Sequence, residues 1–143
     1  MNKTLLVVLT CVITLLGCDE DEQVTFDPSK KFDLRVTVTG VTDEDGNIYI
    51  GIRDKNQTVV AEHIGPAVEA STVLLEQIPA GEYDVFTFQD IDANNQLAMA
   101  GMMPKEPLGY SGNKILTGPP QFSATSFKLT ENSEQTIKLF DYR

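Results

Sequence analysis

The sequence is poor in the side chains that most metal sites and all thiol chemistry require. Its 143 residues contain a single histidine, His63, and two cysteines, Cys11 and Cys18, both near the start of the chain. One histidine cannot build a zinc site that draws on several His or Cys ligands. If Cys11 is removed with a signal peptide and Cys18 is modified, as argued below, the folded part contains no thiol. An internal disulfide and thiol catalysis are then excluded.

Positive charge is also scarce. Lys and Arg number 11 against 21 Asp and Glu, so the formal net charge is −10. The basic residues are scattered singly, apart from Lys30-Lys31. Nucleic-acid binding needs a dense basic surface that neutralises phosphates. We therefore expect no nucleic-acid partner.

The chain also lacks an apolar run of the roughly 20 residues that a membrane-spanning helix needs. Instead, Lys3 precedes a run of twelve mostly apolar residues, Leu5 to Leu16, which ends at Gly17-Cys18. A basic start followed by a short apolar stretch and a small residue is typical of a secretion signal. The acidic residues 19–22 that follow would be costly to bury in lipid. We predict a lipoprotein signal peptide at residues 1–17.

Leu15-Leu16-Gly17-Cys18 resembles the bacterial lipobox. The resemblance implies that the Cys18 sulfur carries lipid and that Cys18 becomes an acylated N-terminus, with palmitate as a typical chain. Several acyl chains, at about 0.8 kcal/mol per buried CH₂, hold a protein on a bilayer almost irreversibly. We expect a lipid-anchored envelope protein, at the outer membrane (periplasmic face or cell surface) rather than the inner membrane.

Residues 18–31 have the polar composition of a solvated tether. Their acidic run, 19–22, is either a solvating spacer or a sorting signal that resembles those of surface lipoproteins. Asp19, directly after the cysteine, instead resembles an inner-membrane retention signal. The remaining residues, 32–143, have the length of one domain, with no room for a second core.

From residue 32 onward the apolar residues alternate with a period of two, as in half-buried strands. Phe32 to Thr39 and Ile48 to Arg53 flank a turn cluster at 43–47, which predicts a hairpin. Residues 122–129 and 135–142 predict a second hairpin.

Further strands are expected at 57–61, 72–78 and 83–88. Residues 63–66 are expected to be irregular, because Pro66 lacks a donor and restricts its predecessor. No sustained helical periodicity is present. The sequence therefore predicts an all-β fold: an antiparallel β-sandwich, immunoglobulin- or transthyretin-like, of about seven strands with one long Pro/Gly-rich loop.

The long loop, residues 97–121, is the main candidate for a binding surface. Loops of this length are uncommon in compact domains and are often functional. Soft and aromatic side chains in it either cap the sandwich or contact a partner. The residues that we expect at such a surface are Met102, Met103, Glu106, Tyr110 and Asn113.

A second candidate precedes that loop. Oxygen-bearing side chains alternate at Asp90, Asp92, Asn94 and Gln96. Calcium needs six or more converging oxygens, but an EF-hand loop begun at Asp90 would require Gly and Glu where Asn95 and Gly101 stand. Two interpretations stay open: a turn held by side-chain to backbone hydrogen bonds, and a calcium site, with calcium as the chain's one cofactor.

Nothing in the sequence indicates a catalytic site. His63 has no serine motif that would complete a triad, and no pair of carboxylates stands out for glycoside hydrolysis. We predict a non-catalytic binding or structural module whose 90–121 region contacts an envelope protein or a glycan. A calcium-stabilised module is the alternative, and a hydrolase is the least favoured one.

An ordered series of motifs supports the same fold and address. It runs through Ile78-Pro79-Ala80-Gly81-Glu82-Tyr83, Asp90-x-Asp92-x-Asn94, Pro104-x-Glu106, Gly109-Tyr110-Ser111-Gly112-Asn113, Pro119 and Phe122. The series resembles domain-of-unknown-function family 2141 (DUF2141) over residues 34–142. The resemblance implies a secreted or envelope β-sandwich with no assigned activity. The family's later aspartate falls near Ala98-Met99, and its histidine before the loop is Gln89, which weakens a metal assignment.

Overall fold

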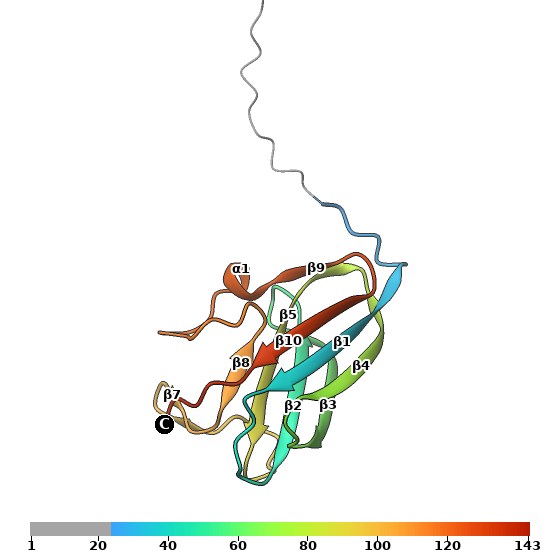
Figure 1. Ribbon diagram of the computed structural model, residues 1–143. Helices are drawn as coiled ribbons and strands as arrows, with labels where there is room; N and C mark the ends of the chain where they lie inside the picture. Colours follow the sequence, from blue (N-terminus) through green and yellow to red (C-terminus); the bar gives the residue numbers. More distant parts are fainter. Residues whose placement is uncertain (1–23) are drawn as a thin grey trace, which may run out of the picture.

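The computed structural model describes residues 24–143; the predictions for the signal peptide 1–17, for Cys18 and for the acidic run 19–22 lie outside this range. The described chain forms ten strands and one short helix (Figure 1). The strands are β1 (Lys31–Thr39), β2 (Asn47–Arg53), β3 (Val59–Pro66), β4 (Ser71–Pro79), β5 (Gly81–Asp90), β6 (Met99–Ala100), β7 (Met103–Pro104), β8 (Leu108–Tyr110), β9 (Phe127–Leu129) and β10 (Ser133–Lys138). The helix, α1, is Phe122–Thr125. Within residues 24–143, no helix is long and apolar enough to cross a membrane.

One sheet has the strand order β10-β1-β4. β1 pairs with β4 in antiparallel and with β10 in parallel orientation. Along β1, Leu34, Val36 and Val38 are fully buried, and the residues between them remain partly or fully exposed. A strand with one face on the core produces this alternation, so the period-two pattern predicted for this segment is confirmed.

The second sheet has the order β3-β2-β5-β8, and β9 pairs with the start of β5. β5 therefore has partners along both edges: β2 on one side, and β8 and β9 on the other. All its residues except Glu82 and Phe86 are buried. The inner face of β5 packs on the core, and its outer face is covered by the segment that follows Asp90.

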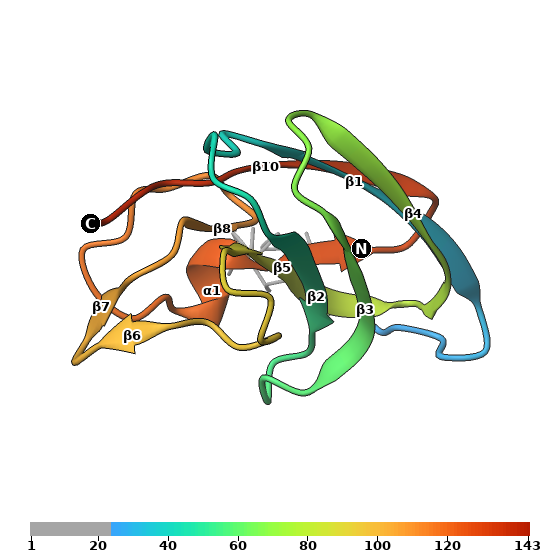
Figure 2. The same cartoon turned by 90° about the horizontal axis from the view of Figure 1, so that it is seen from below.

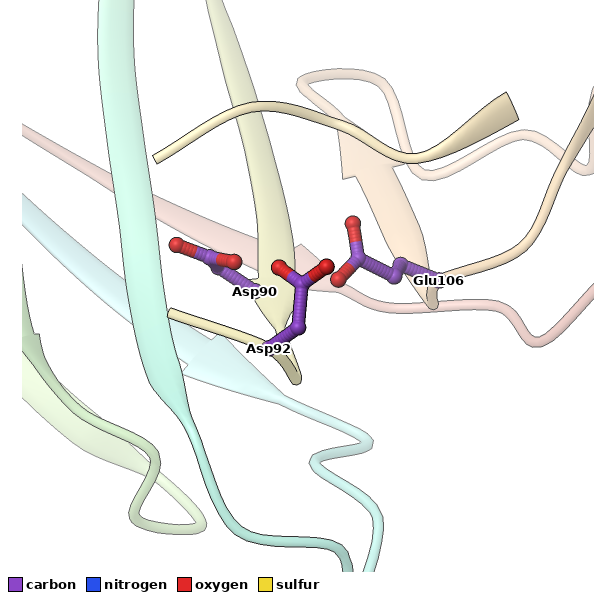
Figure 3. A group of neighbouring side chains, drawn as sticks. All are labelled: Asp90, Asp92 and Glu106. Atoms are coloured by element: carbon purple, nitrogen blue, oxygen red, sulfur yellow. The ribbon is translucent and has the colours of Figure 1, made fainter. Parts of the chain in front are cut away.

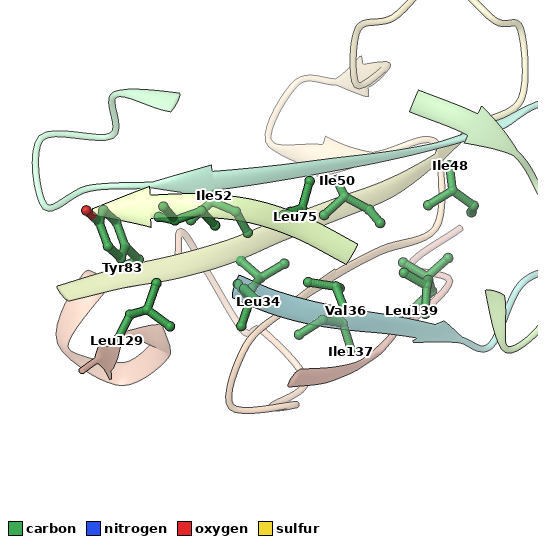
Figure 4. Close-up of a cluster of buried hydrophobic side chains, with 13 residues drawn as sticks. Leu34, Val36, Ile48, Ile50, Ile52, Leu75, Tyr83, Leu129, Ile137 and Leu139 are labelled. Atoms are coloured by element: carbon green, nitrogen blue, oxygen red, sulfur yellow. The ribbon is translucent and has the colours of Figure 1, made fainter. Parts of the chain in front are cut away.

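The main hydrophobic core lies between the two sheets (Figures 2 and 4). Both sheets contribute branched side chains, as expected when two half-apolar sheets pack face to face. The buried members are Leu34, Val36, Val38, Ile48, Ile50, Ile52, Leu75, Ile78, Tyr83, Val85, Leu129, Ile137 and Leu139. The predicted all-β, sandwich-like fold is confirmed, with open and mainly antiparallel sheets.

Both predicted hairpins are wrong. β1 and β2 belong to different sheets, so residues 40–46 carry the chain across the core instead of turning it back. β9 pairs with β5, whereas β10 pairs with β1. Alternation identifies which face of a strand is buried, but it does not identify the strand that pairs with it. The same side chains are buried whether the pairing partner is the next strand in the sequence or a distant one.

Other segments also differ from the prediction. Residues 63–66 are regular: they complete β3, an edge strand with Pro66 at its last position, where a missing donor is tolerated. Phe122–Thr125, predicted as strand, form α1. The expected long loop contains β6, β7 and β8.

Gly109 in β8 allows an unusually close approach to β10. A Cβ atom at this position would collide with the carbonyl oxygen of Lys138. Because glycine has no Cβ atom, the two segments come close enough for Leu108 and Phe140 to exchange backbone hydrogen bonds of 3.1 and 2.9 Å. Glycine thus fixes β8 and the C-terminal segment against each other, and both contribute to the site described next.

Candidate functional site

The segment 91–121 contributes β8 to the edge of the five-stranded sheet, and its other parts pack over the outer face of that sheet. Phe88, Leu108 and Tyr110 form a second hydrophobic cluster there, separate from the main core, with Leu97 and Leu116 packed against it. The exposed fractions of Phe88 and Tyr110 are only 3% and 8%. The segment is therefore a folded cover on the sheet rather than a free loop.

A cleft of about 650 Å³ lies in this cover. The β6–β7 hairpin forms one wall, the loop 116–120 forms the other, and the buried residues Leu108 and Tyr110 lie at the bottom. The full lining is Leu97, Met99, residues 101–104, Leu108, Tyr110, residues 116–120 and Tyr142. It includes no charged side chain. A concave, mainly apolar surface of this size is typical of small-ligand sites.

Methionines dominate the exposed wall of the cleft. Met99, Met102 and Met103 are 47%, 78% and 54% exposed. Their unbranched, polarisable side chains adapt to irregular shapes, and a group of exposed apolar residues marks an interaction surface. Met102 and Met103, proposed from the sequence, thus both line the cleft.

Few polar groups reach the cleft. The backbone N–H of Leu116 donates to the Tyr142 hydroxyl at 3.0 Å, which ties one wall to the C-terminal segment. Burial raises the pKa of Tyr110 above its ordinary value, so its hydroxyl stays protonated at neutral pH. Tyr110, also proposed from the sequence, therefore lines the cleft with a neutral side chain.

Asn113 was proposed as a binding residue, but it does not line the cleft. Its side-chain amide donates to the Thr136 carbonyl at 2.7 Å, and its side-chain oxygen accepts from the Lys138 N–H at 2.8 Å. Its φ of 51° is one that asparagine tolerates better than most residues. Asn113 therefore holds the start of the 113–120 loop against β10.

Glu106, the remaining proposed binding residue, faces an acidic turn at the end of β5 instead of the cleft. Oxygen atoms of Asp90, Asp92 and Glu106 lie within 4.8 Å of one another (Figure 3). Asp90 and Glu106 are buried and Asp92 is exposed. None of the salt bridges in the described part of the chain involves these three residues. Carboxylates this close repel one another unless other groups compensate.

Backbone N–H groups compensate at Glu106. Its two carboxylate oxygens accept from the N–H groups of Ile91 and Ala98, at 2.8 and 2.9 Å. Because these residues begin and end the turn, one buried side chain holds the turn at both ends.

The other predicted metal ligands take part in the same turn. Asp90 accepts from the N–H groups of Asn94 and Asn95 at 3.0 and 2.7 Å. The Asn94 amide donates to Asp92 at 2.8 Å, and its oxygen accepts from the Gln96 N–H at 2.7 Å. The Gln96 side chain is exposed. The structure thus brings Asp90 and Asp92 together with Glu106, while Asn94 and Gln96 serve the turn.

A buried ion pair supports the bottom of the cleft. Arg53 donates to both carboxylate oxygens of Asp84, at 2.9 and 2.7 Å, and Thr125 adds a third hydrogen bond of 3.0 Å. The guanidinium carbon lies 4.9 Å from the ring centroid of Phe86 and 5.2 Å from that of Tyr110. The pair therefore connects β2, β5, β8 and α1.

A shallower groove of about 500 Å³ runs along the outer face of the same sheet, lined in part by Tyr49, Glu62 and Phe86. The Tyr49 hydroxyl donates to Glu62 at 2.9 Å. Burial, followed by this hydrogen bond, raises the pKa of Tyr49 to about 12. No motif in the sequence indicated this groove, because its residues come from β2, β3, β5 and the segment that follows β5.

The structure also places His63, the one histidine considered for a hydrolytic triad. His63 lies in β3, opposite Ile50 of β2. Within residues 24–143, one group of three close metal-ligating side chains occurs, and it consists of Asp90, Asp92 and Glu106 without His63.

A comparison with known families matches residues 36–138 to a family described as "Uncharacterized protein conserved in bacteria (DUF2141)". The match covers more than half of the 143 residues. The chain belongs to the DUF2141 family. The resemblance drawn from the ordered motifs is thereby confirmed. No curated protein matches this DUF2141 chain.

Several motifs that carried the DUF2141 resemblance meet around the acidic turn and the cleft, whereas Ile78 and Tyr83 of the first motif lie in the main core. Asp90, Asp92 and Glu106 form the turn, while Pro104 and Tyr110 line the cleft. Residues that are separated in sequence therefore build two adjoining features of one surface.

The two departures from the family pattern have structural roles in this DUF2141 domain. Gln89, where the family has histidine, is fully buried. Its side chain accepts from the Thr42 N–H at 2.9 Å and donates to the Glu44 carbonyl at 2.6 Å, which fixes the β1–β2 connection. Ala98, near the family's later aspartate, offers only its N–H to Glu106. The turn thus has fewer side-chain ligands than the family pattern provides.

Proposed function

We propose that this DUF2141 protein is a lipid-anchored, non-catalytic binding module of the bacterial cell envelope, and that its cleft holds the apolar part of a ligand. The cleft is the observation that carries the proposal. Its volume of about 650 Å³ lies within the common range of small-ligand pockets, about 300–1,000 Å³. Its lining offers dispersion contacts to hydrocarbon but few partners for the hydroxyls of a glycan. An apolar ligand is therefore favoured over a glycan.

The envelope address rests on the sequence. A signal peptide at 1–17, a lipidated Cys18 and a polar tether would keep the domain beside a bilayer. The family description supports the bacterial origin that a lipobox requires. Outer-membrane placement, on the periplasmic face or the cell surface, remains our proposal for the location.

A charge placed in the cleft should weaken the binding of an apolar probe. Met103→Asp introduces a carboxylate that a bound hydrocarbon would have to desolvate. We expect at least a tenfold rise in the Kd of N-phenyl-1-naphthylamine, measured by fluorescence titration, which corresponds to about 1.4 kcal/mol. Leu74→Asp is the matched control. Leu74 in β4 is 47% exposed and Met103 is 54% exposed, but Leu74 lies outside the cleft. Equal affinities for the two variants would contradict the proposal.

Calcium binding at the acidic turn is the second candidate. The observation that favours it is a third carboxylate, because the fold places Glu106 beside Asp90 and Asp92. None of these three side chains takes part in a salt bridge within residues 24–143. Carboxylate oxygens are the ligands that calcium prefers. The backbone hydrogen bonds described above hold the same turn, and a calcium ion would add stability to it.

If calcium binds the folded turn, calcium at one hundred times its Kd should raise the unfolding free energy by about 2.7 kcal/mol. Glu106→Gln should remove that gain, because it removes one of three carboxylates; it should also lower stability without calcium, since its NH2 group cannot accept from both Ile91 and Ala98. Thermal unfolding with calcium and with chelator, together with calorimetric titration, provides the measurement. An unchanged melting temperature and no binding heat would eliminate this candidate.

A further inference from the structure

Two uncharged segments project at the mouth of the cleft. Neither 97–104 nor 115–120 contains an Asp, Glu, Lys or Arg. The most exposed apolar side chains of the two segments are Met102, at 78%, and Ile115, at 67%. In both overall views the β6–β7 hairpin lies on the side of the domain that holds the C-terminus (Figures 1 and 2). Exposed apolar residues gathered in this way indicate a surface that something else covers.

The charges around these segments differ in sign from the rest of the chain. The charged residues within 97–121 are Lys105, Glu106 and Lys114. Glu106 is 3% exposed and accepts two N–H groups of the acidic turn, so the exposed charges are Lys105 and Lys114. In a chain of net charge −10, residues 97–121 thus expose two lysines and no acidic side chain, while beside Tyr142 of the cleft Asp141 is paired with Arg143. Such a surface is complementary to a bilayer that contains anionic lipid.

We propose that the β6–β7 hairpin and the 113–120 loop form a bilayer-docking surface. Met102, Met103 and Ile115 enter the interfacial region, and Lys105 and Lys114 contact anionic headgroups. The cleft then opens toward the acyl chains. This inference rests on the lipid anchor of the proposed function, since the anchor keeps a bilayer within reach.

The tether is long enough for this contact. Nine residue steps separate Cys18 from Asp27, where a hydrogen-bonded turn joins the domain, and they can span up to about 30 Å at ~3.3–3.6 Å each. A domain of this size has a radius of gyration of about 14 Å, hence a diameter on the order of 35 Å. Because the span is close to the domain's diameter, a domain that lies on the bilayer can place the anchor and the docking surface in the same leaflet.

A bilayer suits this surface better than a protein partner. Protein interfaces depend on a few buried aromatic or arginine anchors, whereas the projecting segments 97–104 and 115–120 contain no aromatic residue and no arginine. A tethered surface also meets its own membrane at high effective concentration, so even weak contacts are populated.

Tryptophan fluorescence tests the proposal directly, because the sequence contains no tryptophan. The lipidated full chain carrying Met102→Trp is reconstituted into vesicles of anionic and zwitterionic phospholipid with brominated acyl chains, which quench tryptophan at membrane depth. Leu74→Trp is the control, since β4 lies on the side away from β7 in both views (Figures 1 and 2). Ile115→Trp is a second reporter should Met102→Trp fail to fold.

We expect the fluorescence of Met102→Trp or Ile115→Trp to be quenched at least threefold more strongly than that of Leu74→Trp. Its emission should also be blue-shifted, and Lys105→Glu with Lys114→Glu should reduce that shift. If the protein co-floats with the vesicles but the reporter and control variants are quenched equally, the docking surface is wrong. The lipid anchor would still stand, because co-flotation depends on the anchor alone. A blue shift of the reporter tryptophan that appears only after an envelope protein fraction is added would also overturn the docking surface. It would indicate that a protein, and not the bilayer, covers these residues. Protein that fails to co-float would remove the lipid anchor, and the docking surface with it.

Discussion

Replacing Asp84 by alanine should lower the free energy of unfolding by about 3–5 kcal/mol, because the change leaves the Arg53 charge buried without its partner. The side chains of Asp84 and Arg53 are only 1% and 13% exposed, and their hydrogen bonds are bidentate. Urea unfolding followed by far-ultraviolet circular dichroism gives the value. We also expect weaker probe binding, since Arg53 packs against Tyr110 at the bottom of the cleft.

A surface pair in the same protein provides the control. Arg35 and Glu134 approach to 3.2 Å, but their side chains are 51% and 78% exposed. Glu134→Ala should therefore cost less than about 1 kcal/mol. The double replacement Arg53→Met with Asp84→Leu should recover much of the lost stability, because it removes both charges and keeps the volume. A cost below about 1 kcal/mol for Asp84→Ala alone would contradict the buried pair.

Replacing Cys18 by serine should move the whole population from the membrane fraction to the soluble fraction and abolish incorporation of labelled palmitate. Serine has no thiol to accept lipid, and without acyl chains the polar tether has little affinity for a bilayer. Fractionation of cells that express either form, followed by immunoblotting, gives the distribution.

Cys11→Ser is the matched control for this experiment. Cys11 is the only other cysteine and lies within the predicted signal peptide, so its replacement should leave both anchoring and labelling unchanged. If both variants stay in the membrane fraction, or if mass spectrometry of the mature chain finds an N-terminus other than an acylated Cys18, the proposed anchor is wrong.

The strands could be predicted from the sequence, but their partners could not. The alternation of Leu34, Val36 and Val38 requires a half-buried strand, and the structure confirms it. The same alternation is compatible with pairing to β2, to β4 or to β10, because each choice buries the same face. The contacts that decide between them, such as Gln89 holding residues 42–44, connect distant parts of the sequence.

The candidate site could be predicted only in part for the same reason. Met102, Met103 and Tyr110 stood out as soft or aromatic residues in a long loop, and all three line the cleft. Leu116 and Tyr142 complete it from segments with no motif of their own. Glu106 lies in the expected loop, but its burial turns it toward Asp90 and Asp92. No local pattern could have revealed that contact.

The methyl groups of the methionines provide the most direct test that the cleft is the binding site. The chain has four methionines; Met1 lies in the predicted signal peptide, and Met99, Met102 and Met103 all line the cleft. A mature protein labelled with ¹³C at its methionine methyls should give three signals, each reporting on this surface. On titration with apolar lipid extracted from the bacterial envelope, all three should shift and saturate together. Saturable binding that leaves all three signals unmoved would place the ligand elsewhere and contradict a function for the cleft.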